Sequence, residues 1–210
     1  GILGREETTN MSDEATRAGF IAVVGAPNVG KSTLTNRAVG SKVSIVSPKV
    51  QTTRTRVLGI FSLAASQVIF IDTPGIFQPR RRLDRAMVAA AWSGATNADR
   101  ILLLVNAASG IDSNTDAILQ KLVPTKRRAV LAINKVDLIR KESLLALTAE
   151  LSPLGIFDEI FMISAETGDG VKDLLKFLAN NLPKGPWLFP KDQISDMPER
   201  LLAAEITREK

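Results

Sequence analysis

The segment best suited to chemistry runs from Gly25 to Ser32 and is followed by Thr33. It has the form G-x-x-x-x-G-K-S, the P-loop pattern, and it comes directly after the apolar run 20–24. Glycines without a Cβ let backbone N–H groups turn toward a phosphate, Lys31 adds a mobile positive charge, and the Ser32 hydroxyl can bind Mg²⁺. The residues expected to line this phosphate site are Ala26, Pro27, Asn28, Val29, Gly30, Lys31, Ser32 and Thr33.

A second candidate is Asp72, which ends the apolar run 67–71 and precedes Thr73-Pro74-Gly75. A carboxylate at the tip of a strand beside a P-loop is placed to hold Mg²⁺ through water. An aspartate that starts an ordinary turn before Pro-Gly is the alternative for these four residues taken alone. The P-loop upstream favours the metal role.

The tetrapeptide Asn134-Lys135-Val136-Asp137 follows another apolar run, 129–133. The carboxylate of Asp137 can accept paired hydrogen bonds from N1–H and the exocyclic amine of guanine, an edge that adenine lacks. Lys135 can lie along the base and ribose, and Asn134 can connect this loop to the P-loop. The pattern indicates selection of GTP over ATP.

The last polar motif is Ser164-Ala165-Glu166, after the run 160–163. In this motif, the backbone N–H of Ala165 is available to meet O6 of guanine. All these motifs follow apolar runs, and loops at the carboxyl ends of parallel strands converge on one crevice. We therefore expect them to build a single site.

Apolar runs alternate with helical patterns along the chain, which predicts an α/β fold of the P-loop NTPase type. The expected architecture has three layers, α/β/α, around a mostly parallel six-stranded sheet with one antiparallel edge strand. Helix 32–39 is expected to end at Gly40 in a left-handed conformation. The expected strands are 20–24, 56–63, 67–71, 101–105, 129–133 and 160–163, and the other expected helices are 83–95, 112–122, 144–151 and 171–181.

Composition limits the chemistry that remains. The 210 residues include no cysteine and no histidine, so disulfides and Cys- or His-based metal sites are excluded. The formal net charge of +5 suits an anionic partner, but a dispersed solvated surface explains it equally well. The arginines 80–82 sit in the predicted loop 76–82, and the sequence leaves open whether they contact RNA.

We expect four segments along the chain. Residues 1–10 resemble the remnant of an expression tag, with Met11 as the native start, and residues 11–18 form a polar N-terminal segment without a targeting pattern, which favours the cytoplasm. Residues 19–182 are expected to form the nucleotide-binding domain. Residues 183–210 begin with a proline-containing linker and continue into the start of a helix.

With these motifs, the sequence resembles the translation-factor-type GTPases, and most closely the Era family. The general motifs are those above together with Thr52-Thr53 in the loop 43–55. The Era likeness depends on three further segments, 51–54, 164–168 and 192–196. The resemblance implies a C-terminal KH domain that binds the 3′ end of small-subunit ribosomal RNA, and this chain ends where that domain would begin.

The resemblance also implies roles for individual residues. Ser32 and Thr53 would ligate Mg²⁺, with Thr52 as the alternative, and Asp72 would act through water. Lys31, Thr53 and Gly75 would form the catalytic set, with Gly75 sensing the γ-phosphate of GTP. Ser164, Ala165 and Glu166 would complete the GTP/GDP site.

Position 76 carries isoleucine where Ras-like enzymes have a water-orienting glutamine, so the intrinsic rate should be slow. In related GTPases an asparagine at the position of Asn28 helps hold K⁺, and we take K⁺ as a hypothesis against a structural role for Asn28. The partners implied are ribosomal RNA and the small ribosomal subunit, through the C-terminal domain. The domain itself is expected to be monomeric, and a peripheral contact with the inner membrane is left open.

Three other functions are compatible with parts of the sequence. The first is a nucleotide-gated binding module with negligible hydrolysis, which Ile76 supports. The second is another ribosome-assembly or tRNA-modification GTPase. The third, a P-loop ATPase or kinase, is argued against by Asp137.

Overall fold

The computed structural model describes residues 15–40, 56–72 and 98–189. Its strands are β1 (Arg17–Gly25), β2 (Arg56–Leu63), β3 (Ser66–Asp72), β4 (Arg100–Asn106), β5 (Ala129–Asn134) and β6 (Phe157–Met162). Its α-helices are α1 (Lys31–Val39), α3 (Ser113–Leu122), α4 (Lys141–Leu151) and α5 (Val171–Asn180). The predicted helix 83–95 and the loops 43–55 and 76–82 lie outside the described residues.

The strands form one sheet in the order β2-β3-β1-β4-β5-β6. β2 runs antiparallel to β3, and every other neighbouring pair is parallel. β2 and β3 are joined by a tight turn at Ala64-Ala65, as expected of a hairpin at the sheet edge. The predicted fold class, with a mostly parallel six-stranded sheet and one antiparallel edge strand, is confirmed.

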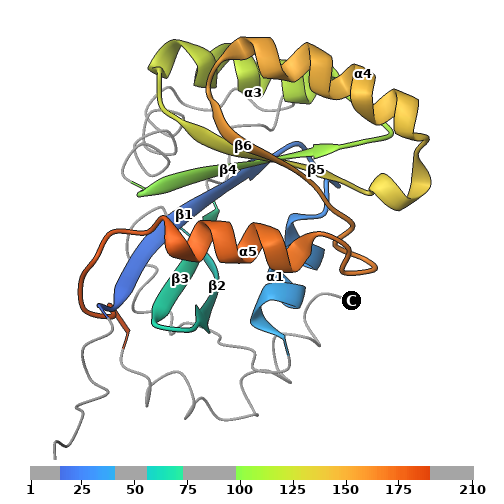
Figure 1. Cartoon of the computed structure of the whole chain (residues 1–210). Helices are drawn as coiled ribbons and strands as arrows, with labels where there is room; N and C mark the ends of the chain where they lie inside the picture. Colours follow the sequence, from blue (N-terminus) through green and yellow to red (C-terminus); the bar gives the residue numbers. More distant parts are fainter. Residues whose placement is uncertain (1–14, 41–55, 73–97, 190–210) are drawn as a thin grey trace, which may run out of the picture.

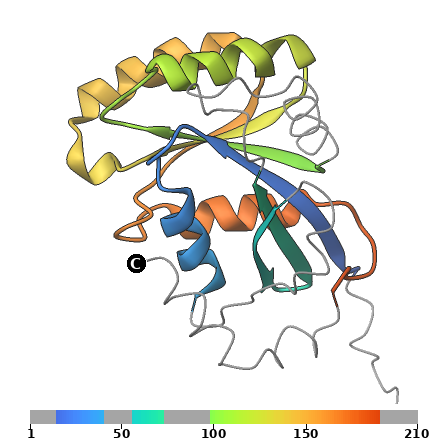
Figure 2. The ribbon, with the colours of Figure 1, turned by 180° about the vertical axis from the view of Figure 1, so that it is seen from behind.

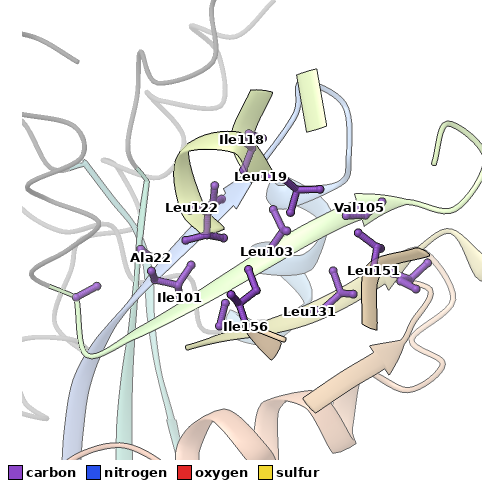
Figure 3. Packing of buried hydrophobic residues seen from close by; sticks show 14 of the residues in the cluster. Ala22, Ile101, Leu103, Val105, Ile118, Leu119, Leu122, Leu131, Leu151 and Ile156 are labelled. Carbon is purple, nitrogen blue, oxygen red and sulfur yellow. The ribbon is translucent and has the colours of Figure 1, made fainter. Parts of the chain in front are cut away.

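Helices cover both faces of the sheet, α3 and α4 on one side and α1 and α5 on the other (Figures 1 and 2). Successive residues of a strand point to opposite faces, so β4 contributes to both cores. Leu103 and Val105 pack with Ile118 of α3 and Leu151 of α4 (Figure 3). Leu102 and Leu104 belong to the opposite cluster, with Leu34 of α1 and Leu174 and Leu178 of α5. This double burial explains why the strands read as continuous apolar runs.

Three local predictions were wrong in detail. β6 begins at Phe157 and ends at Met162, whereas 160–163 was expected. α4 begins at Lys141 rather than at residue 144. In both cases polar residues on an exposed edge or first turn continue an element that hydrophobic periodicity does not reveal. Gly40 has the expected positive φ of 65°, but its ψ of −145° is not left-handed helical.

The segment after α5 packs against the start of the sheet. The Trp187 indole N–H donates to the Ala65 carbonyl oxygen at 2.9 Å. The side chain of Gln67, fully buried, accepts from the N–H groups of Leu188 and Phe189. Arg17 at the start of β1 forms an antiparallel bridge with Lys184. Described residues on both sides of 19–182 therefore pack against this sheet.

Candidate nucleotide site

The predicted motifs meet at one edge of the sheet. The P-loop follows β1, Asp72 ends β3, Asn134 ends β5, and Ser164 lies just beyond β6. These four strands are parallel within the sheet, so their carboxyl ends lie on the same side. The prediction that these loops meet at one edge of the sheet is confirmed for these four loops.

The P-loop has the backbone that its glycines predict. Gly30 is the N-cap of α1 and has a φ of 102°, a conformation that residues with a Cβ rarely adopt. A Cβ at Gly30 would also overlap the side-chain amide of Asn134. Asn28 has a positive φ of 66° as well, whereas Ala26 and Val29 are buried and anchor the loop in the core. The loop leads directly into the N-terminus of α1, where unpaired N–H groups favour an anion.

Lys31 and Asp72 lie next to each other at the mouth of the loop. The ammonium nitrogen of Lys31 is 3.6 Å from a carboxylate oxygen of Asp72, and the two side chains are 26% and 19% exposed. Ser32, the next residue of α1, is exposed. A carboxylate and a hydroxyl are hard oxygen donors of the kind that Mg²⁺ takes alongside substrate phosphates, so these residues fit that ion.

Asn134 connects three loops through one buried amide. Its Nδ2 donates to the carbonyl oxygen of Val29 in the P-loop at 2.8 Å, and its Oδ1 accepts from the N–H of Ala165 at 2.9 Å. The residue is 2% exposed, so water cannot replace either bond. The predicted link from the Asn134 loop to the P-loop is confirmed. The bond to Ala165 in the Ser164 loop is a further link that the sequence did not predict.

Lys135 and Asp137 lie on either side of Val136. The Lys135 ammonium donates to the carbonyl oxygen of Asn28 at 2.9 Å, which joins the two loops a second time. Asp137 is exposed, and among the described residues its carboxylate has no hydrogen-bond or ion-pair partner. Its acceptor capacity is therefore open to a ligand.

In the loop 164–168, one N–H group has a different hydrogen-bond partner from the one predicted. The N–H of Ala165, which sequence reasoning assigned to guanine O6, donates to Asn134 instead. Ser164, Thr167 and Gly168 also have their N–H groups bonded, to the Asp169 carbonyl, the Ser164 hydroxyl and the Ser164 carbonyl. Within the part of the loop that the structure describes, the N–H of Glu166 is the donor left without an acceptor.

Sequence reasoning missed Arg37, which lies in the last turn of α1. Its Nε donates to the Ala165 carbonyl at 2.6 Å and its Nη2 to the Glu166 carbonyl at 2.5 Å. An arginine on an exposed helix face carries no motif signal, so only the fold reveals this contact. Arg37 also borders an open hollow of about 450 Å³, lined by Thr33, Asn36, Arg37, Gly40, Ala165 and Glu166.

Some predicted site residues lie outside the described ranges. These are Thr52, Thr53, Gly75, Ile76 and the arginines 80–82. The described part of the site therefore consists of the P-loop, Asp72, the Asn134 loop and the Ser164 loop. Within the described ranges, no helix has the length and hydropathy needed to cross a membrane.

Comparison with known proteins points to one family. Residues 20–135 match the family described as 50S ribosome-binding GTPase. The chain is 55% identical to GTPase Era of Brucella melitensis over 195 residues, covering 93% of this chain and 63% of that protein. It is 55% identical to GTPase Era of Sinorhizobium medicae, covering 97% of this chain and 67% of that protein. The chain thus spans about two thirds of the length of these relatives.

Solved structures agree. The chain is similar to an Aquifex aeolicus Era variant bound to GDP and aluminium fluoride, with a TM-score of 0.72, 42% identity, and coverage of 92% of this chain and 66% of that one. It is equally similar to Era in complex with MgGDPNP and a segment of 16S ribosomal RNA, with a TM-score of 0.73 and 42% identity over 92% of this chain and 66% of that one. A likeness to the G domain of the Thermotoga maritima FeoB iron transporter, at 21% identity, extends to the fold alone.

The P-loop, the guanine-type Asn134 motif joined to it, and extensive identity to these relatives lead to one conclusion: the chain belongs to the 50S ribosome-binding GTPase family and, within it, to the Era GTPases.

Proposed function

We propose that this protein binds GTP and GDP with Mg²⁺ and hydrolyses GTP to GDP and phosphate as a molecular switch. The observation that carries the proposal is the buried Asn134 amide, which binds the phosphate loop and the Ser164 loop together. A phosphate loop alone suits any nucleoside triphosphate. Its rigid connection to the exposed Asp137 carboxylate favours guanine, since a wrong base would leave that carboxylate unpaired.

The residues divide the work between phosphate and base. Lys31 and the N-terminal N–H groups of α1 would bind the β- and γ-phosphates, while Ser32 and Asp72 would bind Mg²⁺, with Thr53 as a further ligand. When bound, the ion neutralises charge on the phosphates. Gly75 would sense the γ-phosphate. Asp137, Lys135 and the loop 164–166 would bind guanine and ribose.

Ile76 bears on catalysis because its aliphatic side chain cannot orient water. We therefore propose that K⁺, held with the help of Asn28, supplies positive charge during hydrolysis. Asn28 is an exposed residue of the phosphate loop, and this exposure, which leaves its side-chain amide oxygen accessible to an ion, supports the proposal.

The proposed partner is small-subunit ribosomal RNA, in ribosome assembly. A related Era structure holds a segment of 16S ribosomal RNA, and the net charge of +5 suits an anionic partner. We further propose a cytoplasmic location, a monomeric domain, and peripheral contact with the inner membrane as a property to test in the whole protein.

A second candidate, a nucleotide-gated binding module with negligible hydrolysis, is favoured by Ile76. Phosphate release from GTP under multiple turnover, in KCl and in NaCl with ATP as the control, separates the two. We expect slow, GTP-specific release that rises in potassium. Tight GTP binding without release in either salt would favour the binding module, and equal release from ATP would contradict guanine selection.

A further inference from the structure

Arg37 connects the loop 164–168 to α1, the helix that follows the P-loop. It lies in the last turn of α1, whose N-cap is Gly30 of the P-loop. Its guanidinium donates to two successive carbonyl oxygens, those of Ala165 and Glu166, at 2.6 and 2.5 Å. No carboxylate of the described residues forms an ion pair with Arg37, so its charge acts on the peptide groups of this loop.

The loop is shaped to receive this side chain. Gly168 has a φ of 94°, and a Cβ there would lie 2.9 Å from Nη1 of Arg37. Glycine at this position therefore leaves room for the guanidinium as well as permitting the backbone conformation. Both the Arg37 side chain on α1 and the glycine at position 168 in the loop therefore favour this contact.

The first of these bonds orients a particular N–H group. The carbonyl of Ala165 and the N–H of Glu166 belong to the same peptide unit, and in a trans peptide they point in opposite directions. When Arg37 holds the carbonyl toward α1, the N–H of Glu166 must point to the other side of the loop. Hydrogen bonding to a charged donor also polarises the peptide and makes its N–H a stronger donor.

The N–H of Glu166 has no acceptor among the residues that the structure describes. The N–H groups of Ser164, Ala165, Thr167 and Gly168 all have acceptors within the described residues, and Glu166 is the exception. The adjoining peptide is also restrained, because Arg37 binds the Glu166 carbonyl. Both peptide units around the Cα of Glu166 are therefore oriented by one side chain.

We infer that Arg37 is a positioning residue for base recognition, and that it orients the Glu166 N–H to donate to the 6-oxo group of guanine. The inference rests on the proposed function and deepens it. Recognition of the guanine 2-amino group by Asp137 is a separate contact from a separate loop. Loss of Arg37 should therefore affect one edge of the base and spare the other.

Competition binding with three diphosphates tests this separation. GDP has both groups, 6-thio-GDP replaces the 6-oxo oxygen with sulfur, a weak acceptor, and IDP lacks the 2-amino group. For Arg37→Ala we expect GDP affinity to fall about tenfold, because an oriented hydrogen bond is lost. The affinity for 6-thio-GDP should fall less, so that the preference for GDP over 6-thio-GDP shrinks. The preference for GDP over IDP should stay as in the wild type.

Two further variants serve as controls. Arg37→Lys keeps the charge and most of the stem but cannot serve both carbonyls in the same geometry, so an intermediate loss is expected. Arg128→Ala removes an arginine that likewise donates to two backbone carbonyls, those of Gly155 and Phe157, and also pairs with Asp158. Arg128 precedes the first residue of β5, at the opposite end of that strand from Asn134. This variant should leave all three affinities unchanged.

The possible failures are distinguishable. If Arg37→Ala and Arg37→Lys weaken all three ligands by the same factor, or none of them, the inference is overturned and the proposed function stands. If the wild-type protein prefers neither GDP over ADP nor GDP over IDP, the proposed function fails, and this inference fails with it.

Discussion

The side-chain N–H of Asn134 donates to the carbonyl oxygen of Val29 at 2.8 Å, across 105 residues of sequence. The same side chain accepts from Ala165, so one buried amide binds the phosphate loop and both loops proposed for the base. Replacement of this amide should therefore affect the whole site.

Asn134→Ala should lower both stability and nucleotide affinity. It leaves the Val29 carbonyl and the Ala165 N–H unpaired in a buried position, at a cost of about 2–4 kcal/mol in the free energy of unfolding. Urea denaturation and GDP titration measure the two effects. Asn180→Ala, at an exposed position on α5, is the matched control and should change neither. A wild-type midpoint for Asn134→Ala would contradict the structural role.

Gly30→Ala should weaken GDP binding through two separable causes. Its φ of 102° is strained for alanine, and its Cβ would overlap the Asn134 amide. Gly110→Ala, at a φ of 58° with its nearest neighbour at 3.8 Å, carries backbone strain without the overlap and is the control for stability. In the double variant with Asn134→Ala, the side chain that the new Cβ would overlap is absent. The loss in the free energy of unfolding for the double variant should therefore be smaller than the sum of the losses for the two single variants, by on the order of 1 kcal/mol. If the losses of the two single variants add up to that of the double variant, the Asn134 side chain moves away from the new Cβ without a cost in stability.

Asn28→Gly should remove the potassium dependence of GTP turnover. Glycine accepts the φ of 66° that Asn28 adopts, so this variant deletes the side chain without straining the loop. We expect the potassium rate to fall to the sodium rate while GDP affinity changes little. Equal rates of GTP turnover by the wild-type protein in potassium and in sodium would contradict the K⁺ hypothesis without any variant. Phosphate release in each salt provides the measurement.

Gly59→Ala should destabilise the fold by a route independent of the ligand. A Cβ at Gly59 in β2 would lie 2.8 Å from a Val39 methyl and 3.0 Å from the Thr35 methyl, so α1 would be pushed off the sheet. Overpacking of this kind costs about 1–3 kcal/mol. Gly185→Ala, which meets nothing within 4 Å, should be within about 0.5 kcal/mol of the wild type. Thermal unfolding of the two variants makes the comparison, and equal stabilities would show that α1 yields freely.

Much of the architecture could be read from the sequence because it depends on local patterns. Strands buried on both faces appear as continuous apolar runs, which is how β1, β3, β4 and β5 were located within a residue or two, or three at the start of β1. Glycine at position 30 follows from a backbone conformation that other residues avoid. Element ends were less accurate, as at Lys141 and Phe157, because exposed polar residues extend a helix or an edge strand without any periodic signal.

Residue types and spacing are enough to identify the motifs, their order, and the strands that they follow. The parallel topology then brings four of these motifs to one edge. The pairing of individual atoms depends on the folded arrangement. The Ala165 N–H went to Asn134 rather than remaining open for a base. Among the described residues, the N–H of this loop that has no acceptor is one residue further on, at Glu166. Arg37 reaches two carbonyls some 130 residues away because α1 and the loop after β6 pack side by side. Such pairings depend on distances and directions between segments far apart in the chain, which residue types and spacing do not contain.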